Sequence, residues 1–325
     1  MNEKNKTLPR RADRIWKSST VLVYAVLAAM LLISEVISPG FLKRQHMNTI
    51  LTQAGFLGIV AIGQTLIIMT GGIDLSIASV ITLTNLVAAQ IMNGKDANIL
   101  QALFIALAIG LAAGAVNGIC VHYLRVPAII MTLATGSVIE GIGYLYSKGM
   151  PSGYTAPLLN RFSTGRMFDL IPYVVVLWAL LAVTVLILLY RTPFGRSIYA
   201  VGANAVTARY SGINIAATTI LVYAISGVCA AIVGVLYVGY TKTSFLDVGS
   251  AFTMTSVAAV VVGGTSPSGG EGGYAGTIAG AIIMTVLTAL LTVINIQESG
   301  RSIMEGVIIL LLVYLYSRKT VRKKH

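Results

Sequence analysis

Long apolar runs recur along almost the whole chain, and they constrain its fold more than any other feature. A bilayer core about 30 Å thick is crossed by roughly 20 helical residues. Runs of about that length fall at residues 19–38, 50–70, 74–92, 99–124, 128–146, 171–190, 218–240, 252–264, 274–294 and 302–316, of which the eighth and tenth are short. Because backbone amides in lipid need partners within their own segment, these runs predict helices. We therefore expect an all-α, polytopic membrane protein with about ten transmembrane helices.

The charged residues are few and unevenly placed. Only 10% of the residues are charged, whereas soluble proteins carry about a quarter, and the formal net charge is +12. The basic residues concentrate before the first run, after the last, and in one long loop. If the N-terminus is cytoplasmic, ten spans place these groups on one side, as the positive-inside rule requires. Topology thus explains the charge, and no nucleic-acid partner is expected.

This topology divides the chain into three parts. Residues 1–18 form a basic cytoplasmic arm, residues 19–316 a transmembrane domain, and residues 317–325 a basic cytoplasmic tail. Within the transmembrane domain, residues 191–217 form a long cytoplasmic loop. Both termini are predicted to lie in the cytoplasm.

A carboxylate interrupts the apolar runs at "MTGGIDLS", residues 69–76. A charge at the centre of a span costs about 2.5–3.5 kcal/mol, so Asp74 needs a reason to be there. It could cap the helix that follows, which we favour, or it could contact a solute. On that helix, Asp74, Ala78, Thr82 and Asn85 form one small, polar stripe that could pack against helices or line a path.

Other polar residues within the runs extend the set of pathway candidates. Glu140 has no partner visible in the sequence, whereas Glu305 follows Arg301 by one helical turn and suits an ion pair. The candidate pathway residues are Asp74, Ser76, Thr82, Asn85, Asn117 and Glu140.

Paired glycines interrupt apolar runs in both halves of the chain. "VVVGGTSPSGGEGGYAG" at 260–276 echoes the first break, and such interruptions are typical of duplicated transport units. The candidate gating glycines are Gly71, Gly72, Gly263 and Gly264. Glycines spaced by four residues predict close helix packing instead. They are Gly110, Gly114 and Gly118 in one run and Gly276 and Gly280 in another.

Enzymatic and nucleotide-binding motifs are not found. The glycine-rich stretch 263–273 lacks the lysine of a phosphate-binding loop, and its G-x-G-x-x-A spacing precedes a membrane helix rather than following a strand. The three histidines have neither metal-ligand spacing nor a plausible Ser or Cys partner in the sequence. We expect no catalytic residue, no metal site and no bound cofactor, so any ATP must be hydrolysed by another chain.

The cytoplasmic loop contains a short predicted helix, "AVTARYS". Asn204 can cap its start, and Gly212 can end it in a left-handed conformation. A helix this short is marginal in water, so it must gain stability by docking. A cytosolic partner is one possibility, and the membrane surface, with Arg209 toward lipid phosphate, is the other.

These motifs together resemble the permease subunits of bacterial ABC importers for simple sugars, over nearly the whole chain. "GGIDLSIASV", "GRSIYAVGANAVTARYSGIN" and "AAVVVGGTSPSGGEGGYAGT" match that group's three signatures in order. Branched-chain amino acid permeases share distant ancestry but lack the first signature. In the second, the resemblance assigns ATPase coupling to Gly195, Arg196, Asn204, Ala208, Arg209, Ser211, Gly212 and Ile213.

The resemblance implies a set of partners and a location. It implies a multi-pass protein of the bacterial cytoplasmic (inner) membrane that pairs with a second permease, identical or not. Two cytosolic ATPases would bind ATP and magnesium and grip the short helices, and a soluble extracytoplasmic binding protein would deliver the sugar. Ala78 departs from the glycine common in the group, and residues 251–256, residues 288–289 and Glu140 depart from the ribose permease, which suggests a different sugar.

The sequence is also compatible with two other functions. A proton-coupled secondary transporter would use Asp74 or Glu140 and would work without an ATPase. A channel-like or assembly protein would need no ATP and would tolerate changes at Gly212.

Overall fold

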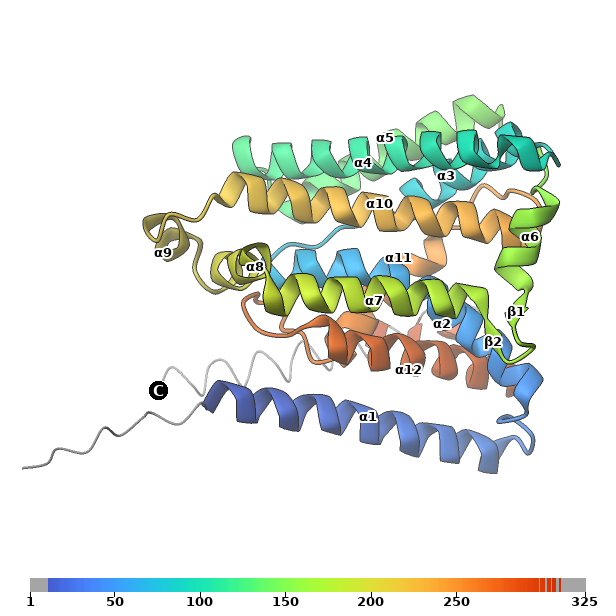
Figure 1. The fold of residues 1–325 in the computed structure, drawn as a ribbon, viewed down its shortest axis with the longest axis horizontal. Helices are drawn as coiled ribbons and strands as arrows, with labels where there is room; N and C mark the ends of the chain where they lie inside the picture. Colours follow the sequence, from blue (N-terminus) through green and yellow to red (C-terminus); the bar gives the residue numbers. More distant parts are fainter. Residues whose placement is uncertain (1–10, 298, 302, 305, 308–309, 311–325) are drawn as a thin grey trace, which may run out of the picture.

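Long helices lie side by side along one axis in the computed structural model of the protein (Figure 1). The structure describes residues 11–297, 299–301, 303–304, 306–307 and 310. The long helices are α1 (Arg11–Ile37), α2 (Arg44–Met69), α3 (Ile77–Met92), α4 (Ile99–Tyr123), α5 (Ala128–Ser147), α7 (Tyr173–Arg191), α10 (Ile215–Thr241), α11 (Ser250–Val262) and α12 (Tyr274–Val293). The short elements are η1 (Asp96–Asn98), α6 (Pro157–Thr164), β1 (Arg166–Met167), β2 (Ile171–Pro172), α8 (Pro193–Ala203) and α9 (Ala205–Tyr210).

The helices confirm the predicted fold class. Within the described residues, 7 helices are long and apolar enough to cross a membrane, and α3 and α11 are shorter apolar helices. Nine of the predicted runs match these helices to within a few residues at most ends, although α1 begins at Arg11 rather than near residue 19. The tenth run, at 302–316, falls largely outside the described residues, as does Glu305.

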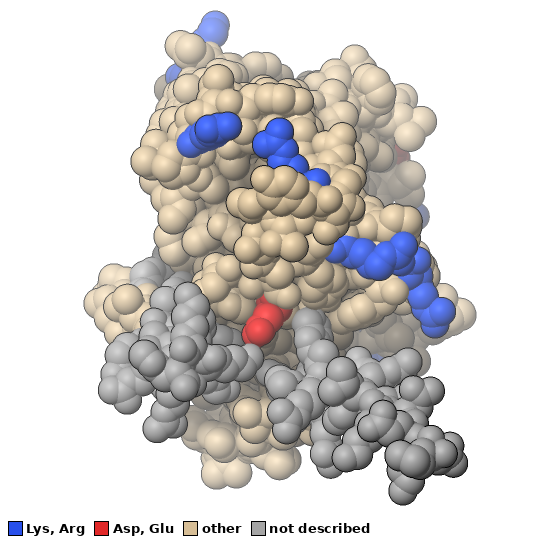
Figure 2. Space-filling view, turned by 90° about the vertical axis from the view of Figure 1, so that its left-hand side faces the viewer, with Lys and Arg blue, Asp and Glu red and all other residues tan. Residues whose placement is uncertain are grey.

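Short elements mark the two ends of the bundle (Figure 1). Helices α8 and α9 lie at one end, which we call the α9 end. Helix α6 and the antiparallel pair β1–β2 lie at the other, the α6 end. Figure 2 views the α9 end, where Lys and Arg side chains gather. Because the loop 191–217 is predicted to be cytoplasmic, we expect the α9 end to face the cytoplasm.

Helix α10 lies at the centre of the bundle and packs against α2, α3 and α4. Its closest approach is to α4, where both helices carry glycine. A Cβ atom on Gly227 would overlap the carbonyl oxygen of Gly110, and one on Gly114 would overlap the carbonyl oxygen of Tyr223. The four-residue glycine spacing therefore forms the expected packing face.

Glycine also sets the packing of α11 on α12. A Cβ on Gly276 would overlap the carbonyl oxygen of Gly263, and one on Gly280 would overlap that of Ala259. Thr65 of α2 and Thr277 of α12 meet through their hydroxyls at 3.0 Å. Gly263 thus acts in helix packing, and Gly264, with φ of +91°, makes the turn that follows α11.

We predict that Gly227→Ala destabilises the protein, because the added methyl group would force α10 away from the backbone of α4. Overpacking of this kind costs about 1–3 kcal/mol, which outweighs the gain of up to about 1 kcal/mol in helix propensity. The measurement is thermal unfolding of the detergent-solubilised protein. Gly141→Ala is the matched control, because nothing lies within 4 Å of a Cβ at that position. Equal melting temperatures for the two variants would contradict the α4–α10 packing.

Candidate solute pathway and coupling segment

The chain leaves the helical conformation between Met69, where α2 ends, and Ile77, where α3 begins. Gly71 adopts φ of +85°, which a residue with a side chain rarely tolerates. A Cβ on Gly72 would lie 2.6 Å from the hydroxyl of Tyr223, so this second glycine gives room to α10. The paired glycines therefore permit the break for two different reasons.

Asp74 lies within this break, is only 1% exposed, and accepts three hydrogen bonds. Its Oδ1 accepts from the backbone N of Ser76 at 2.9 Å and from the Ser76 hydroxyl at 2.6 Å. Its Oδ2 accepts from the hydroxyl of Ser226 on α10 at 2.9 Å. Asn117 of α4 donates through Nδ2 to the Ser76 hydroxyl at 2.9 Å. We call Asp74, Ser76, Asn117 and Ser226 the Asp74 cluster.

The geometry modifies the expected role of Asp74. The N-cap position of α3 belongs to Ser76, not to Asp74, and the helix begins at Ile77 rather than at residue 74. Asp74 binds the amide two residues ahead and joins the break to α10. Ser226 was missed in the sequence, because one serine in an apolar helix is common and nothing local links it to a carboxylate 152 positions away.

Asn85 and Thr82 join α3 to α10 and to the segment between α10 and α11. The Nδ2 of Asn85 donates to the carbonyl of Gly234 at 3.2 Å, and its Oδ1 accepts from the amide of Phe245 at 3.3 Å. The Thr82 hydroxyl accepts from the amide of Gly249 at 3.1 Å. Asn85 is fully buried, so the polar stripe of α3 is largely a packing surface at this position.

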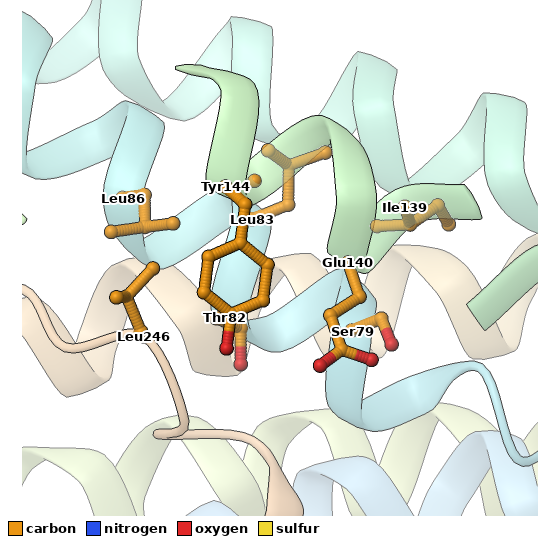
Figure 3. Close-up of a pocket in the computed structure, with 9 residues that line it drawn as sticks. Ser79, Thr82, Leu83, Leu86, Ile139, Glu140, Tyr144 and Leu246 are labelled. Atoms are coloured by element: carbon orange, nitrogen blue, oxygen red, sulfur yellow. The ribbon is translucent and has the colours of Figure 1, made fainter. Parts of the chain in front are cut away.

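Glu140 is the pathway candidate that remains exposed, on α5 (Figure 3). It lines a small recess between α3 and α5 together with Ser79, Thr82 and Tyr144. The recess has a volume of about 10 Å³, enough for roughly one water molecule. Glu140 lies beside Ser79, and no hydrogen bond or ion pair joins it to another residue in the described part of the chain.

The three sequence signatures meet at the α9 end of the bundle. A Cβ on Gly202 of α8 would overlap the carbonyl oxygen of Met69 and would lie 2.5 Å from the amide nitrogen of Gly270. The amide of Gly270 in turn donates to the Met69 carbonyl at 2.9 Å. A Cβ on Gly269 would lie 3.0 Å from the Gly202 carbonyl and 3.1 Å from the amide nitrogen of Gly71. We call these residues, Gly71, Gly202, Gly269 and Gly270, the glycine junction.

The residues assigned to coupling build a short, projecting helix. Asn204 accepts from the amide of Thr207 at 3.0 Å and so caps α9, as predicted. After α9, Gly212 adopts φ of +80°, and the amide of Ile213 donates to the carbonyl of Ala208 at 3.1 Å. Ala208 is buried toward the protein, and the opposite side of α9 is open.

The exposed side of α9 carries Val206, 65% exposed, and Tyr210, 88% exposed. Arg209 is also exposed there. Of the other assigned residues, Gly195 at the start of α8 leaves no room for a side chain against the carbonyl oxygen of Leu189, and the Ser211 hydroxyl donates to the carbonyl of Thr207. Val206 and Tyr210 were missed, because apolar residues in a loop carry no coupling signal of their own.

Comparison with known proteins identifies the family of the chain. Residues 46–313 match the model of the permease component of the branched-chain amino acid transport system. The chain belongs to this permease family. The chain is 35% identical over 314 residues to the ribose import permease protein of Escherichia coli K12, which covers 95% of this chain and 97% of that protein.

Two further relatives extend the comparison. The galactose/methyl galactoside import permease protein of Salmonella typhimurium is 35% identical over 322 residues, covering 93% of this chain and 95% of its own. An inner membrane ABC transporter permease protein of E. coli K12 is 33% identical over 287 residues, covering 86% of this chain and 84% of its own. No solved structure matches the chain. The resemblance to importer permeases is thereby confirmed, and the chain is a membrane permease component rather than an enzyme.

We predict that Asp74→Ala destabilises the protein far more than Asp247→Ala. Loss of the Asp74 carboxylate leaves the amide of Ser76 and the hydroxyl of Ser226 buried without an acceptor, at about 1–3 kcal/mol each. Asp247 is exposed and serves as the matched control. Thermal unfolding in detergent measures the difference. If both variants unfolded alike and only Asp74→Ala stopped transport, solute contact rather than the helix break would explain Asp74.

Proposed function

We propose that this chain is the permease subunit of an ABC importer and forms the path of a ribose- or galactose-type sugar across the bacterial cytoplasmic membrane. The full-length similarity to sugar import permeases supports the substrate class. The observation that carries the mechanism is α9, a short helix with an exposed apolar face at the basic end of the bundle.

Separate ATPases would supply the energy. Exposed Val206 and Tyr210 suit burial in a groove of a partner protein, where aromatic and aliphatic anchors contribute most of the binding energy. Arg209 beside them can meet an acidic rim. Two cytosolic ATPases, which would bind ATP and magnesium, fit this surface better than lipid phosphate does, because α9 lies at the far end of the bundle (Figure 1) and Tyr210 on it is 88% exposed.

The glycine junction would transmit the motion. Gly202 lies one turn before α9 and touches the last carbonyl of α2. A push on α9 would thus reach both glycine breaks at once, through Met69 and Gly270. Alternating access in transporters uses rigid-body movement of this kind around a fixed site.

A second permease and a binding protein would complete the importer. Glu140 on an exposed face of α5 has to face something other than lipid, and a second permease across a shared path meets that need. A soluble extracytoplasmic binding protein would deliver the sugar to the α6 end.

We predict that deleting the gene from its host removes uptake of one sugar among labelled D-ribose, other pentoses, D-galactose and other hexoses, and that restoring the gene restores this uptake; loss of ribose uptake alone would contradict the expectation of a different sugar. The restored uptake should stop when arsenate depletes ATP and should persist when a protonophore collapses the proton gradient. Proton coupling through Glu140 or Asp74 would give the reverse pattern. Uptake that is unchanged by the deletion would overturn the proposed substrate class.

We predict that Val206→Asp abolishes this uptake, because a charge placed in the partner's apolar groove would be buried without a counter-ion. The expected loss is about tenfold or more. Val206→Leu keeps the apolar contact and serves as the control. Because Val206 is exposed, both variants should reach the membrane in normal amounts and melt like the parent protein. Normal uptake by Val206→Asp would show that α9 is not the coupling surface.

A further inference from the structure

The later turns of one outward side of α5 are polar, whereas Ile130 and Leu133 on the earlier turns of that side are exposed and apolar. The polar turns distinguish this part of α5 from a helix surrounded by lipid. Ser137, Glu140, Gly141 and Tyr144 are all exposed and are spaced i, i+3, i+4 and i+7, so they share one side of the helix. We call this set the α5 polar face. It flanks the buried stripe through which α5 packs on α3.

The neighbouring exposed side of α5 is apolar and suits lipid. Val138 is 63% exposed, Ile142 46% and Leu145 82%, and their spacing of i, i+4 and i+7 places them on one side of the helix. The same helix thus presents two outward sides with different chemistry. Only the apolar one matches a hydrocarbon environment, so the α5 polar face needs water or protein.

Glu140 lies deep enough for this distinction to matter. It precedes Ser147, the last residue of α5, by two helical turns, or about 10 Å. At that depth a carboxylate in contact with lipid is strongly disfavoured. No cation on the adjoining wall offsets it, because neither α3 nor α5 contains Lys or Arg.

We propose that the α5 polar face lines the solute path and that Glu140 makes this path selective by charge, admitting neutral and cationic solutes and excluding anions such as sugar phosphates and sugar acids. The carboxylate oxygens accept hydrogen bonds from sugar hydroxyls and repel phosphate. Ser79, Thr82 and Tyr144 add neutral hydroxyls to the same recess. This inference rests on the proposed function, because it needs a path shared with a second permease.

The test measures the reaction of single cysteines with charged thiol reagents, in membrane vesicles that contain the full chain. The two native cysteines, Cys120 and Cys229, are replaced by Ala. Ser137→Cys is then treated with a cationic and with an anionic methanethiosulfonate, with Glu140 intact or as Glu140→Gln. Val138→Cys is the matched control on the apolar side.

With Glu140 intact, the cationic reagent should modify Ser137→Cys about tenfold faster than the anionic one, relative to their rates with a free thiol. In Glu140→Gln this preference should disappear, and high salt should weaken it in the parent. Val138→Cys should resist both reagents. If α5 faced lipid, Ser137→Cys would be as unreactive as Val138→Cys. If the charge preference were the same with and without Glu140, Glu140 would not select solutes by charge. Either result overturns the proposal.

These results are independent of the uptake experiment. If Ser137→Cys showed no charge preference with Glu140 intact while sugar uptake stayed normal and arsenate-sensitive, Glu140 would be refuted as the selecting residue and the importer would be left intact. A clear charge preference together with unchanged uptake after gene deletion would refute the sugar class and would leave an aqueous, charge-selective path in place.

Discussion

The backbone between α2 and α3 gives up its helical hydrogen bonds inside the bundle, and the rest of the structure depends on how these bonds are replaced. Lipid offers no partners, so each exposed amide or carbonyl there must be satisfied by protein. The amide of Leu75 donates to the hydroxyl of Thr132 on α5 at 3.1 Å, and that of Ser76 donates to Asp74. The carbonyl of Met69 accepts from Gly270, in the segment before α12. Two distant segments, α5 and the turn before α12, and the break's own Asp74 therefore stabilise it.

Because its partners belong to different helices, the break cannot move alone. The Met69 carbonyl is at once the acceptor for Gly270 and the surface against which Gly202 packs without a side chain. Any displacement of α8 therefore acts on the end of α2 and on the turn before α12 together. The hydroxyl of Tyr199, also on α8, donates to the Gly272 carbonyl at 3.0 Å and adds a second link to that turn. Close backbone packing thus joins α9 to both glycine breaks without any long-range charge.

Local patterns were enough to predict the helices, the break at Gly71 and Gly72, and the cap of α9, because apolar run length, glycine conformation and Asn capping act over a few residues. The Asp74 cluster could only be half predicted. A costly buried carboxylate demands donors, but Ser226 and Asn117 come from helices whose relative rotation no local pattern determines. The glycine junction is similar: Gly263 and Gly264 were predicted as gating residues, whereas the contact with Gly202 falls on Gly269 and Gly270, and only tertiary packing selects between neighbouring glycine pairs.

Asp74 and Glu140 are equally unusual in a sequence this apolar, and their surroundings separate their roles. A carboxylate that serves the fold should be buried and fully paired, since an unpaired buried charge would cost more than the fold gains. Asp74 meets that condition with three donors from the protein. Glu140 lies within the span, with its carboxylate at an outer surface and in a recess of hydroxyl groups. No hydrogen bond or ion pair within the described part of the chain offsets the free-energy cost of the Glu140 carboxylate in the span. Water or protein in contact with the outer surface of α5 therefore has to offset that cost.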